Sequence, residues 1–408
     1  MLLFENCTIV DAASPEPREG HHVLIEGDRI REVADKPISS DATSIDCGGR
    51  TLMPGLTDAH AHITLTEVDV SRLEKMPLTL LTAHAARSAG AMLERGYTTI
   101  RDAGGADWGL QKAIDDDMFP GPRLLISGRA LSQTGGHGDS RERTSDARAC
   151  ACANGLAFGT VVVDGVTEVR RAVRHELRKG ANQIKVMASG GVISPNDPID
   201  TTQFSKDELR AIVEEAEAWN TYVLAHAYSA RAITHAVSCG VRSIEHGNLV
   251  DREAAELMAR EGAFMVPTLV AYEALSRRGS ELGLAPVSVE KLQIVLDAGL
   301  SSIEHCKAAG VKMGYGSDLL GELQVDQSRE LSILADVLTP HEIIVSATAT
   351  NAELFQREGE IGIISAGALA DLLVVDGDPL SDLQLLQEQG QHLSVIMKGG
   401  KLYKNRLS

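Results

Sequence analysis

The 408-residue sequence predicts an α/β protein, a (β/α)8 barrel of the TIM type with a small β-sandwich domain formed from the two ends of the chain. The barrel is predicted because short apolar runs typical of strands alternate with longer helical stretches over residues 57–356. An alternation of that length favours a parallel sheet. There are about eight such runs, which is the number of strands that closes this kind of barrel.

The two ends of the chain resemble each other and differ from the middle. Residues 1–56 and 357–408 contain short β-type runs separated by Gly, Pro, Asp and Ser, which favour turns. Neither end is long enough to form a stable sheet domain easily by itself. We therefore expect one composite β-sandwich domain built from both ends and attached to the barrel.

Helix start signals separate the expected strands. Ser205 and Glu208 form a capping-box pattern, and Thr339 and Glu342 form another that includes Pro340 at the first helical position. A doubly wound open sheet is the alternative to the barrel. That fold would require a glycine-rich phosphate-binding turn after an early strand, and the sequence has none there.

Composition excludes several classes of protein. With 39 basic and 57 acidic residues the formal net charge is −18, so the chain lacks the positive charge of a protein that binds nucleic acid or an anionic membrane. No stretch reaches the roughly 18 apolar residues of a membrane span. The six cysteines are scattered and do not indicate a disulfide framework, so we expect a cytoplasmic protein.

Several polar residues end or interrupt the expected strands, and a barrel would deliver them to the rim that holds active sites. In chain order they are His60, His62, Lys185, His226, His246 and Asp318. His60 and His62 form an H-x-H pair, and residues two apart on a strand point to the same side. Any one of these residues could be a capping or hydrogen-bonded core residue, but together they indicate a metal site.

Lys185 needs its own explanation, because a protonated ammonium cannot ligate a metal and is unfavourable to bury. Reaction with CO2 would convert the side chain into a carbamate, an anionic ligand able to bridge two cations. Four histidines, one carbamate and one aspartate are sufficient for a binuclear site. The alternative is a lysine that reaches solvent or forms a salt bridge.

The order H-x-H, Lys, His, His, Asp resembles that of the amidohydrolase superfamily. The opening PGLTDAHAH and the closing segment with Gly362, Gly367 and Asp371 extend the resemblance over essentially the whole chain. Within the superfamily the sequence is most similar to the group of imidazolonepropionase-like enzymes and metal-dependent Xaa-Pro dipeptidases, or prolidases. The segments that carry this similarity are TTIRDAGG, SGRALSQTGGHGD, IKVMASGG, AHAYS and SIEHGN.

The resemblance implies two divalent metal ions, with Zn²⁺ as the default for hydrolysis, and a CO2-derived carbamate on Lys185. His60 and His62 would bind the more buried ion. His226 and His246 would bind the second ion, and Lys185 would bridge both.

The resemblance also implies residues that act on the substrate. Asp318 would contact the buried ion and shuttle a proton. His137 could donate to the developing oxyanion, and Tyr228 could bind the carboxylate or carbonyl of the substrate. A loop role for His137 and a packing role for Tyr228 are the alternatives. The candidate cations for a substrate carboxylate are Arg141, Arg143 and Arg231.

The expected activity is hydrolysis of an amide bond in a small substrate that carries a carboxylate, and the resemblance makes Xaa-Pro dipeptides the first choice. The alternatives are carboxypeptidase action on another C-terminal residue, hydrolysis of an N-acyl amino acid, and hydrolysis of a cyclic amide as in imidazolonepropionase. A metal-free barrel scaffold is the non-enzymatic alternative. We expect assembly into homo-oligomers, as in related proteins, and no nucleic-acid or membrane partner.

Overall fold

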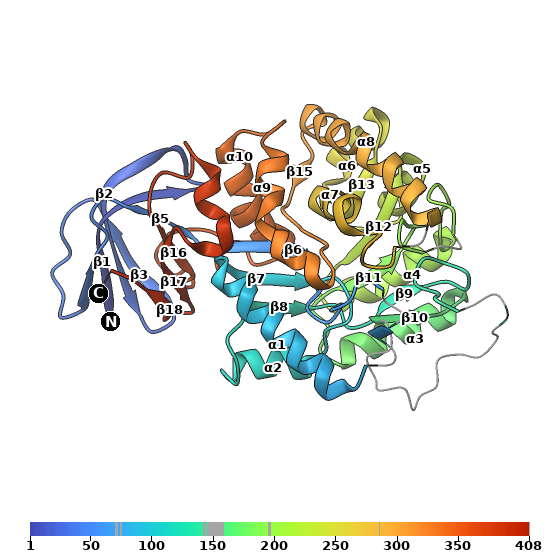
Figure 1. Cartoon of the computed structure of the whole chain (residues 1–408), viewed down its shortest axis with the longest axis horizontal. Coiled ribbons are helices and arrows are strands. Elements are labelled where there is room, and N and C mark those ends of the chain that lie inside the picture. Colours follow the sequence, from blue (N-terminus) through green and yellow to red (C-terminus); the bar gives the residue numbers. More distant parts are fainter. Residues whose placement is uncertain are drawn as a thin grey trace.

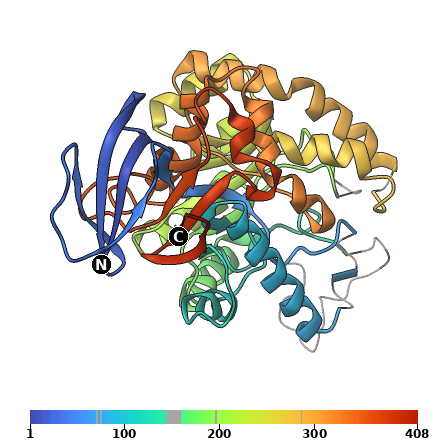
Figure 2. The same cartoon turned by 60° about the vertical axis from the view of Figure 1, so that its left-hand side comes forward.

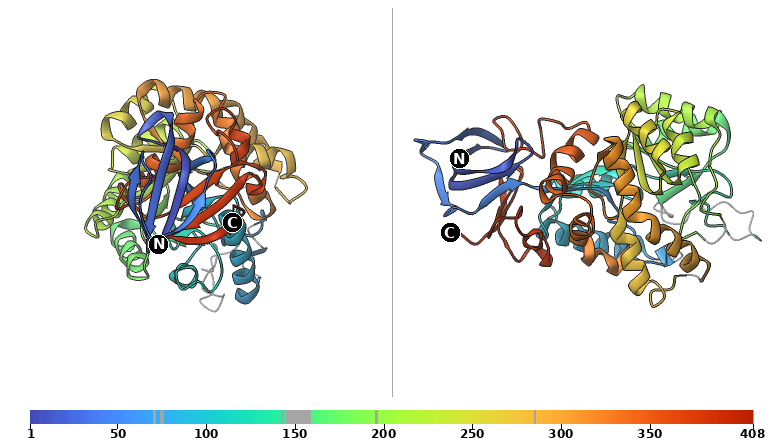
Figure 3. Two further views of the ribbon diagram at one scale, coloured as in Figure 1. Left: turned by 90° about the vertical axis from the view of Figure 1, so that its left-hand side faces the viewer. Right: turned by 90° about the horizontal axis from the view of Figure 1, so that it is seen from above.

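The computed structural model describes residues 1–69, 72, 73, 76–141, 144, 159–194, 197–284 and 286–407. A sheet built from both ends of the chain lies beside the barrel, and both termini lie at this sheet (Figure 1). Figures 2 and 3 show the same two parts from other sides. Within the described residues, no helix combines the length and the apolar character needed to cross a bilayer.

The terminal sheet has eight strands, seven of them in the order β18–β17–β16–β5–β1–β2–β3, and β4 pairs with β1. The pairing of β5 with β16 is antiparallel and joins the two ends of the chain. The strands are β1 (Leu2–Asp11), β2 (Ser14–Glu26), β3 (Arg29–Ala34), β4 (Thr43–Asp46), β5 (Thr51–Pro54), β16 (Leu372–Val375), β17 (Leu393–Lys398) and β18 (Lys401–Asn405).

The barrel strands are parallel and fall into two hydrogen-bonded sheets. They are β6 (Leu56–Ala61), β7 (Tyr97–Asp102) and β8 (Arg123–Ile126), then β11 (Ile184–Met187), β12 (Val223–Ser229), β13 (Ser243–Leu249), β14 (Phe264–Val266) and β15 (Lys312–Met313). The backbone N–H of Ala59 donates to Tyr315 O at 2.8 Å, and that of Asn182 donates to Ile126 O at 2.7 Å. These bonds connect the two sheets at both edges, as a closed barrel requires.

Helices follow the strands and cover the outside of the barrel (Figure 1). They are α1 (Leu78–Glu94), α2 (Trp108–Asp115), α3 (Gly165–Arg178), α4 (Lys206–Glu217), α5 (Ala230–Val237), α6 (Arg252–Glu261), α7 (Leu269–Arg278), α8 (Pro286–Ala309), α9 (Glu330–Leu334), α10 (Pro340–Val345) and α11 (Asn351–Leu354). Short helical segments are η3 (Gly321–Arg329), η4 (Ser346–Thr350), η5 (Leu383–Leu386) and η6 (Glu388–Gly390). Both predicted capping boxes, which begin α4 and α10, are confirmed.

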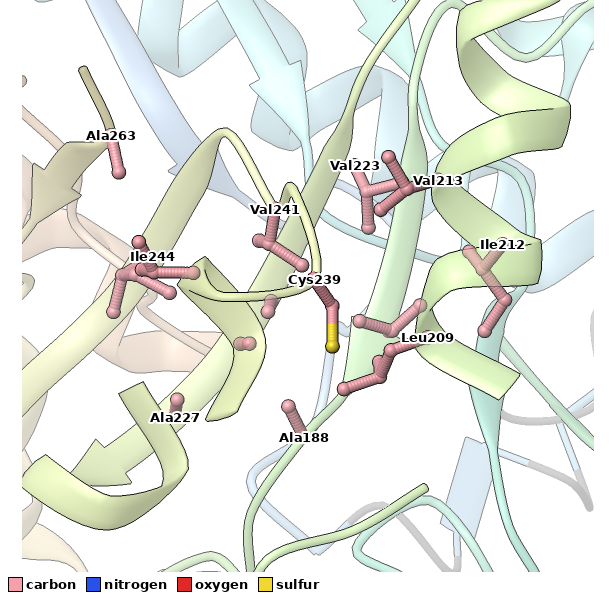
Figure 4. Packing of buried hydrophobic residues seen from close by; sticks show 14 of the residues in the cluster. Ala188, Leu209, Ile212, Val213, Val223, Ala227, Cys239, Val241, Ile244 and Ala263 are labelled. Carbon is pink, nitrogen blue, oxygen red and sulfur yellow. The ribbon is translucent and has the colours of Figure 1, made fainter. Parts of the chain in front are cut away.

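Aliphatic side chains fill the space between helices and strands. Leu209, Ile212 and Val213 of α4 belong to the same buried cluster as Val223 of β12 and Ile244 of β13 (Figure 4). Burying one such side chain stabilises the fold by about 1.5–3 kcal/mol. The 3% aromatic content of the sequence is consistent with an aliphatic core of this kind.

Gly55 divides the segment LMPGLTDAHAH into β5 of the terminal sheet and β6 of the barrel. A Cβ atom at Gly55 would lie 2.1 Å from Thr98 Oγ1, so only glycine fits where the chain enters the barrel beside β7. Two short parallel strands, β9 (Ala130–Ser132) and β10 (Thr160–Val162), are not predicted from the sequence.

Candidate metal centre and active site

His60 and His62 lie at the carboxyl end of β6, next to Asp318. The Oδ1 atom of Asp318 lies 3.4 Å from His60 Nε2 and 3.1 Å from His62 Nε2. One ligand atom from each of the three side chains lies within 4.8 Å of the others. Nitrogen and carboxylate oxygen atoms gathered at this spacing can bind one divalent cation.

The sequence predicted Asp318 at the end of a strand, but β15 ends earlier, at Met313. The backbone N–H groups of Ser317 and Asp318 instead donate to His60 O, at 3.2 and 2.7 Å. A Cβ atom at Gly316 would lie 2.9 Å from the Cβ atom of His60, so the glycine lets this loop approach β6 closely. The loop therefore presents Asp318 to the histidines even though the strand has ended.

The remaining predicted ligands lie on neighbouring strands, Lys185 on β11, His226 on β12 and His246 on β13. The ring centroid of His246 lies 4.7 Å from that of His226 and 4.9 Å from that of His60. Lys185 lies close enough for its charge to lower the pKa of His60, His226 and Asp318. The structure thus brings the predicted ligand residues into one cluster, which we call the ligand cluster.

Each histidine of the ligand cluster has one ring nitrogen already engaged. The pairs are His60 Nδ1 with Glu245 Oε2 (2.7 Å), His62 Nδ1 with Gly104 O (3.0 Å), His226 Nε2 with Gly190 O (3.1 Å) and His246 Nδ1 with Thr268 Oγ1 (2.8 Å). Such a bond fixes the orientation of the ring and leaves the other nitrogen for a metal. The donor set therefore fits divalent cations.

Burial controls the protonation of most of the cluster. It lowers the pKa of His60, His226 and His246, and neutral imidazole is the form that binds metal. Burial also lowers the pKa of Lys185 to about 8. A lower pKa enlarges the fraction of neutral amine, the form that can react with CO2.

Asp318 and His62 form a hydrogen-bonded pair within the cluster. Burial alone would raise the pKa of Asp318, but the electrostatic interaction with His60 and the hydrogen bond from His62 lower it overall. Burial alone would lower the pKa of His62, but the hydrogen bond to Asp318 and the charge of that residue raise it overall. The Asp318 carboxylate is therefore ionised and able to accept a proton.

A buried ion pair that the sequence analysis does not predict lies next to His60. The Oε1 atom of Glu245 accepts hydrogen bonds from Arg101 Nη2 at 2.8 Å and from Ser243 Oγ at 2.5 Å. Strand alternation would place Glu245 and His246 on opposite faces. Because φ of His246 is 74°, the alternation breaks there, and both residues reach His60.

His137 and Tyr228 both lie against His226. The centroid of the His226 ring is 4.4 Å from that of His137 and 4.9 Å from that of Tyr228. A Cβ atom at Gly191 would lie 2.0 Å from Cε1 of His137, so the glycine makes room for this ring. The Tyr228 hydroxyl lies 3.0 Å from that of Tyr272, a residue that the sequence analysis does not single out. Both predicted substrate contacts therefore lie beside the ligand cluster.

The two described candidate arginines are already engaged. Arg141 donates to both carboxylate oxygens of Asp139, at 2.7 and 2.6 Å, and Arg231 donates to Asp200 O at 2.9 Å. Arg143 lies outside the described residues.

Comparisons with known proteins support a common architecture. The sequence model of the Amidohydrolase family matches residues 51–402. Ochratoxinase from Aspergillus niger is 36% identical over 375 residues, which cover 86% of this chain and 75% of the relative. A crystal structure of an amidohydrolase is 52% identical and matches with a TM-score of 0.97, covering 100% of both chains.

A crystal structure of a prolidase complexed with N-methylphosphonate-L-proline is 48% identical, with a TM-score of 0.97, and covers 99% of this chain and 100% of that chain. A crystal structure of a Xaa-Pro dipeptidase with bound methionine is 27% identical, with a TM-score of 0.88, over 99% of this chain and 100% of that chain. These matches confirm the predicted TIM-barrel-type α/β fold.

Proposed function

Because the chain belongs to the Amidohydrolase family, whose members are metal-dependent, and is an amide-bond hydrolase, we propose that it cleaves Xaa-Pro dipeptides as a prolidase. The predicted resemblance to this family is confirmed. The observation that supports cleavage of Xaa-Pro dipeptides is the 48% identity, over 99% of this chain, with a prolidase that binds a phosphonate derivative of proline.

We assign the ligand cluster to two divalent ions, with Zn²⁺ as the default and with Lys185 carboxylated. The fit of the donor set supports this assignment, because each histidine has one ring nitrogen held by another residue and one left for a ligand bond. When bound, such ions polarise an amide carbonyl and lower the pKa of water.

In this proposal, side chains of the protein transfer the proton and bind the carbonyl oxygen of the substrate. Asp318 accepts a proton from the attacking water at a carboxylate oxygen and returns it to the leaving nitrogen. His137 and Tyr228 donate hydrogen bonds to the carbonyl oxygen as negative charge develops there. Burial raises the pKa of Tyr228, so its hydroxyl keeps the hydrogen that it donates.

The similarity to ochratoxinase favours a second candidate function. At 36% identity, that relative is an amide hydrolase whose name does not denote a peptidase. It supports hydrolysis of an N-acyl amino acid, or of an amide of a C-terminal residue other than proline, at the same site.

We also infer the organisation in which this site works. Residues 1–56 and 357–408 would form the composite β-sandwich domain, and residues 57–356 would form the hydrolase barrel. Strand pairing between β5 and β16 supports this division. We expect the protein to act in the cytoplasm as a homo-oligomer on small-molecule substrates.

A substrate screen with metal-loaded protein separates the candidates. The panel contains dipeptides with C-terminal proline, dipeptides with basic or large apolar C-terminal residues, and N-acyl amino acids. Products released only from the Xaa-Pro dipeptides would support the proposal. Faster release from another class would overturn the prolidase assignment and identify the second candidate.

A further inference from the structure

The segment that follows Asp318 is a 3-10 helix of nine residues, η3. Such helices are usually only three or four residues long, and their side chains align every third residue. Gln324, Gln327 and Glu330 follow this spacing, with Glu330 directly after the helix, and they are only 6%, 1% and 0% exposed. We call these residues the η3 stripe. Buried polar groups require partners. Gln327 Oε1 accepts a hydrogen bond from Arg95 Nε at 3.0 Å, and the other side-chain bonds of the stripe lead to the ligand cluster.

One glutamine bonds to β6, which contains His60, and the other bonds to His62 just after this strand. The Nε2 atom of Gln324 donates to His62 O at 2.7 Å, and that of Gln327 donates to Asp58 Oδ2 at 2.8 Å. The other oxygen of Asp58 accepts the backbone N–H of His60 at 2.9 Å. Gln324 thus holds the backbone of His62 directly. Gln327 holds the backbone of His60 through the carboxylate of Asp58.

Glu330 acts on His246 through Thr268. The φ and ψ angles of Thr268 are 53° and 37°, a left-handed conformation that is unfavourable for a β-branched residue. The two carboxyl oxygens of Glu330 accept the next two backbone N–H groups, those of Leu269 at 3.0 Å and Val270 at 2.5 Å. These bonds satisfy backbone N–H groups at the start of α7 that have no partner within the helix. They also hold the turn that places Thr268 Oγ1 2.8 Å from His246 Nδ1.

We propose that the η3 stripe is a positioning device that sets the geometry of His60, His62 and His246 for metal binding, an inference that rests on the proposed metal-dependent function. The stripe bonds the backbone or the turn that carries each ring and leaves the ligating nitrogens themselves untouched. Outer contacts of this kind typically change metal affinity by about 10- to 100-fold.

The test is metal affinity measured by chelator competition on folded, metal-depleted protein. Gln324→Met keeps the length of the side chain and removes the donor to His62 O. We expect at least about tenfold weaker metal binding in this variant. The matched control is Val325→Ala, on the same helix at a side chain that is 53% exposed, and wild-type affinity is expected there.

Melting of the metal-free variants separates positioning from simple stabilisation. A residue that only supports the fold would lower the melting temperature and leave the metal affinity of the folded protein unchanged. Glu330→Gln is the second variant and should also weaken metal binding, because its amide cannot accept both N–H groups of α7. Wild-type affinity in both Gln324→Met and Glu330→Gln would overturn the inference. A wild-type protein that binds no divalent metal would instead overturn the proposed function itself.

Discussion

The Nδ1 atom of His60 lies 2.7 Å from Oε2 of Glu245, and the two side chains are only 1% and 0% exposed. The other carboxylate oxygen of Glu245 forms an ion pair with Arg101 at 2.8 Å. A carboxylate on the outer nitrogen of a metal-binding histidine fixes the tautomer and increases the basicity of the ring. The arginine compensates the buried negative charge, so the three residues form one connected unit behind the proposed metal site.

Glu245→Gln is therefore expected to weaken metal binding by about 10- to 100-fold. It also leaves Arg101 without its anionic partner, and breaking a buried ion pair destabilises a protein by about 3–5 kcal/mol. Chelator competition and denaturant unfolding measure the two effects. Glu253→Gln, at an exposed position of α6, is the control for loss of one carboxylate. Unchanged metal affinity in Glu245→Gln would show that the His60 contact does not support the site.

Lys185→Ala is expected to abolish turnover and lower the metal content, because the proposed bridging ligand is lost. Short-chain carboxylates added to the variant should restore part of the activity, since they can occupy the space of the carbamate. Metal analysis and turnover with and without acetate test this prediction. Full turnover without any added carboxylate would contradict the carbamate assignment.

Asp318→Asn should keep much of the metal and lose most of the turnover. The amide oxygen can still ligate, but it cannot accept and return a proton. General acid–base catalysis typically contributes about 10²- to 10⁴-fold, so we expect a loss of kcat in that range. Metal content and kcat measured on the same preparation separate the two roles, and an unchanged kcat would reject the proton-transfer role.

The sequence predicts the ligand cluster because each of its members interrupts or ends an apolar run that is otherwise typical of a strand. It does not predict Glu245, which is next to His246. Strand alternation would turn the glutamate away, and the φ of 74° at His246 that reverses this is not evident from residue type. Asp318 is predicted as a member of the cluster but is assigned to the end of a strand that ends earlier, at Met313.

Local signals explain which elements of the fold are predictable. The capping boxes at Ser205 and Thr339 are recognisable because all their partners lie within three residues. The η3 stripe has no such signal, since its bonds reach residues far away in the sequence, such as His62. β9 and β10 pair over only three residues each, too short a run to show a period in the sequence.

Stability should depend on pH through Glu330, because burial raises its pKa from 4.5 to about 8. Between these values the native state holds a proton that the unfolded chain has released, so the free energy of unfolding falls as pH rises. The stability contributed by Glu330 is fully present below pH 4.5 and is lost as pH rises through about 8. The loss is at most about 1.4 kcal/mol per pH unit.

Glu330→Gln has no titrating group at this position, so wild type should lose stability relative to the variant as pH rises across that window. Melting of metal-free protein at about pH 5.5, 7 and 8.5 measures the difference. Glu322→Gln, on the preceding helix η3 with a side chain that is 73% exposed, is the matched control. A wild-type–variant difference that does not change with pH would contradict the role of burial at Glu330.

Gly191→Ala tests whether His137 must occupy its observed position. The added Cβ atom would lie 2.0 Å from His137 Cε1, so the ring must move. Displacement of a catalytic group by about 1 Å can lower the rate by about 10²-fold, and we expect a loss of kcat of this order with metal content unchanged. Gly90→Ala, in α1, is the matched control, because its Cβ atom would lie 3.7 Å from Pro120 O, which is an ordinary van der Waals contact. That variant should keep wild-type kcat and gain about 0.5–1 kcal/mol of stability. Since both variants add one methyl group, equal kcat values would mean that His137 does not act at the reacting carbonyl.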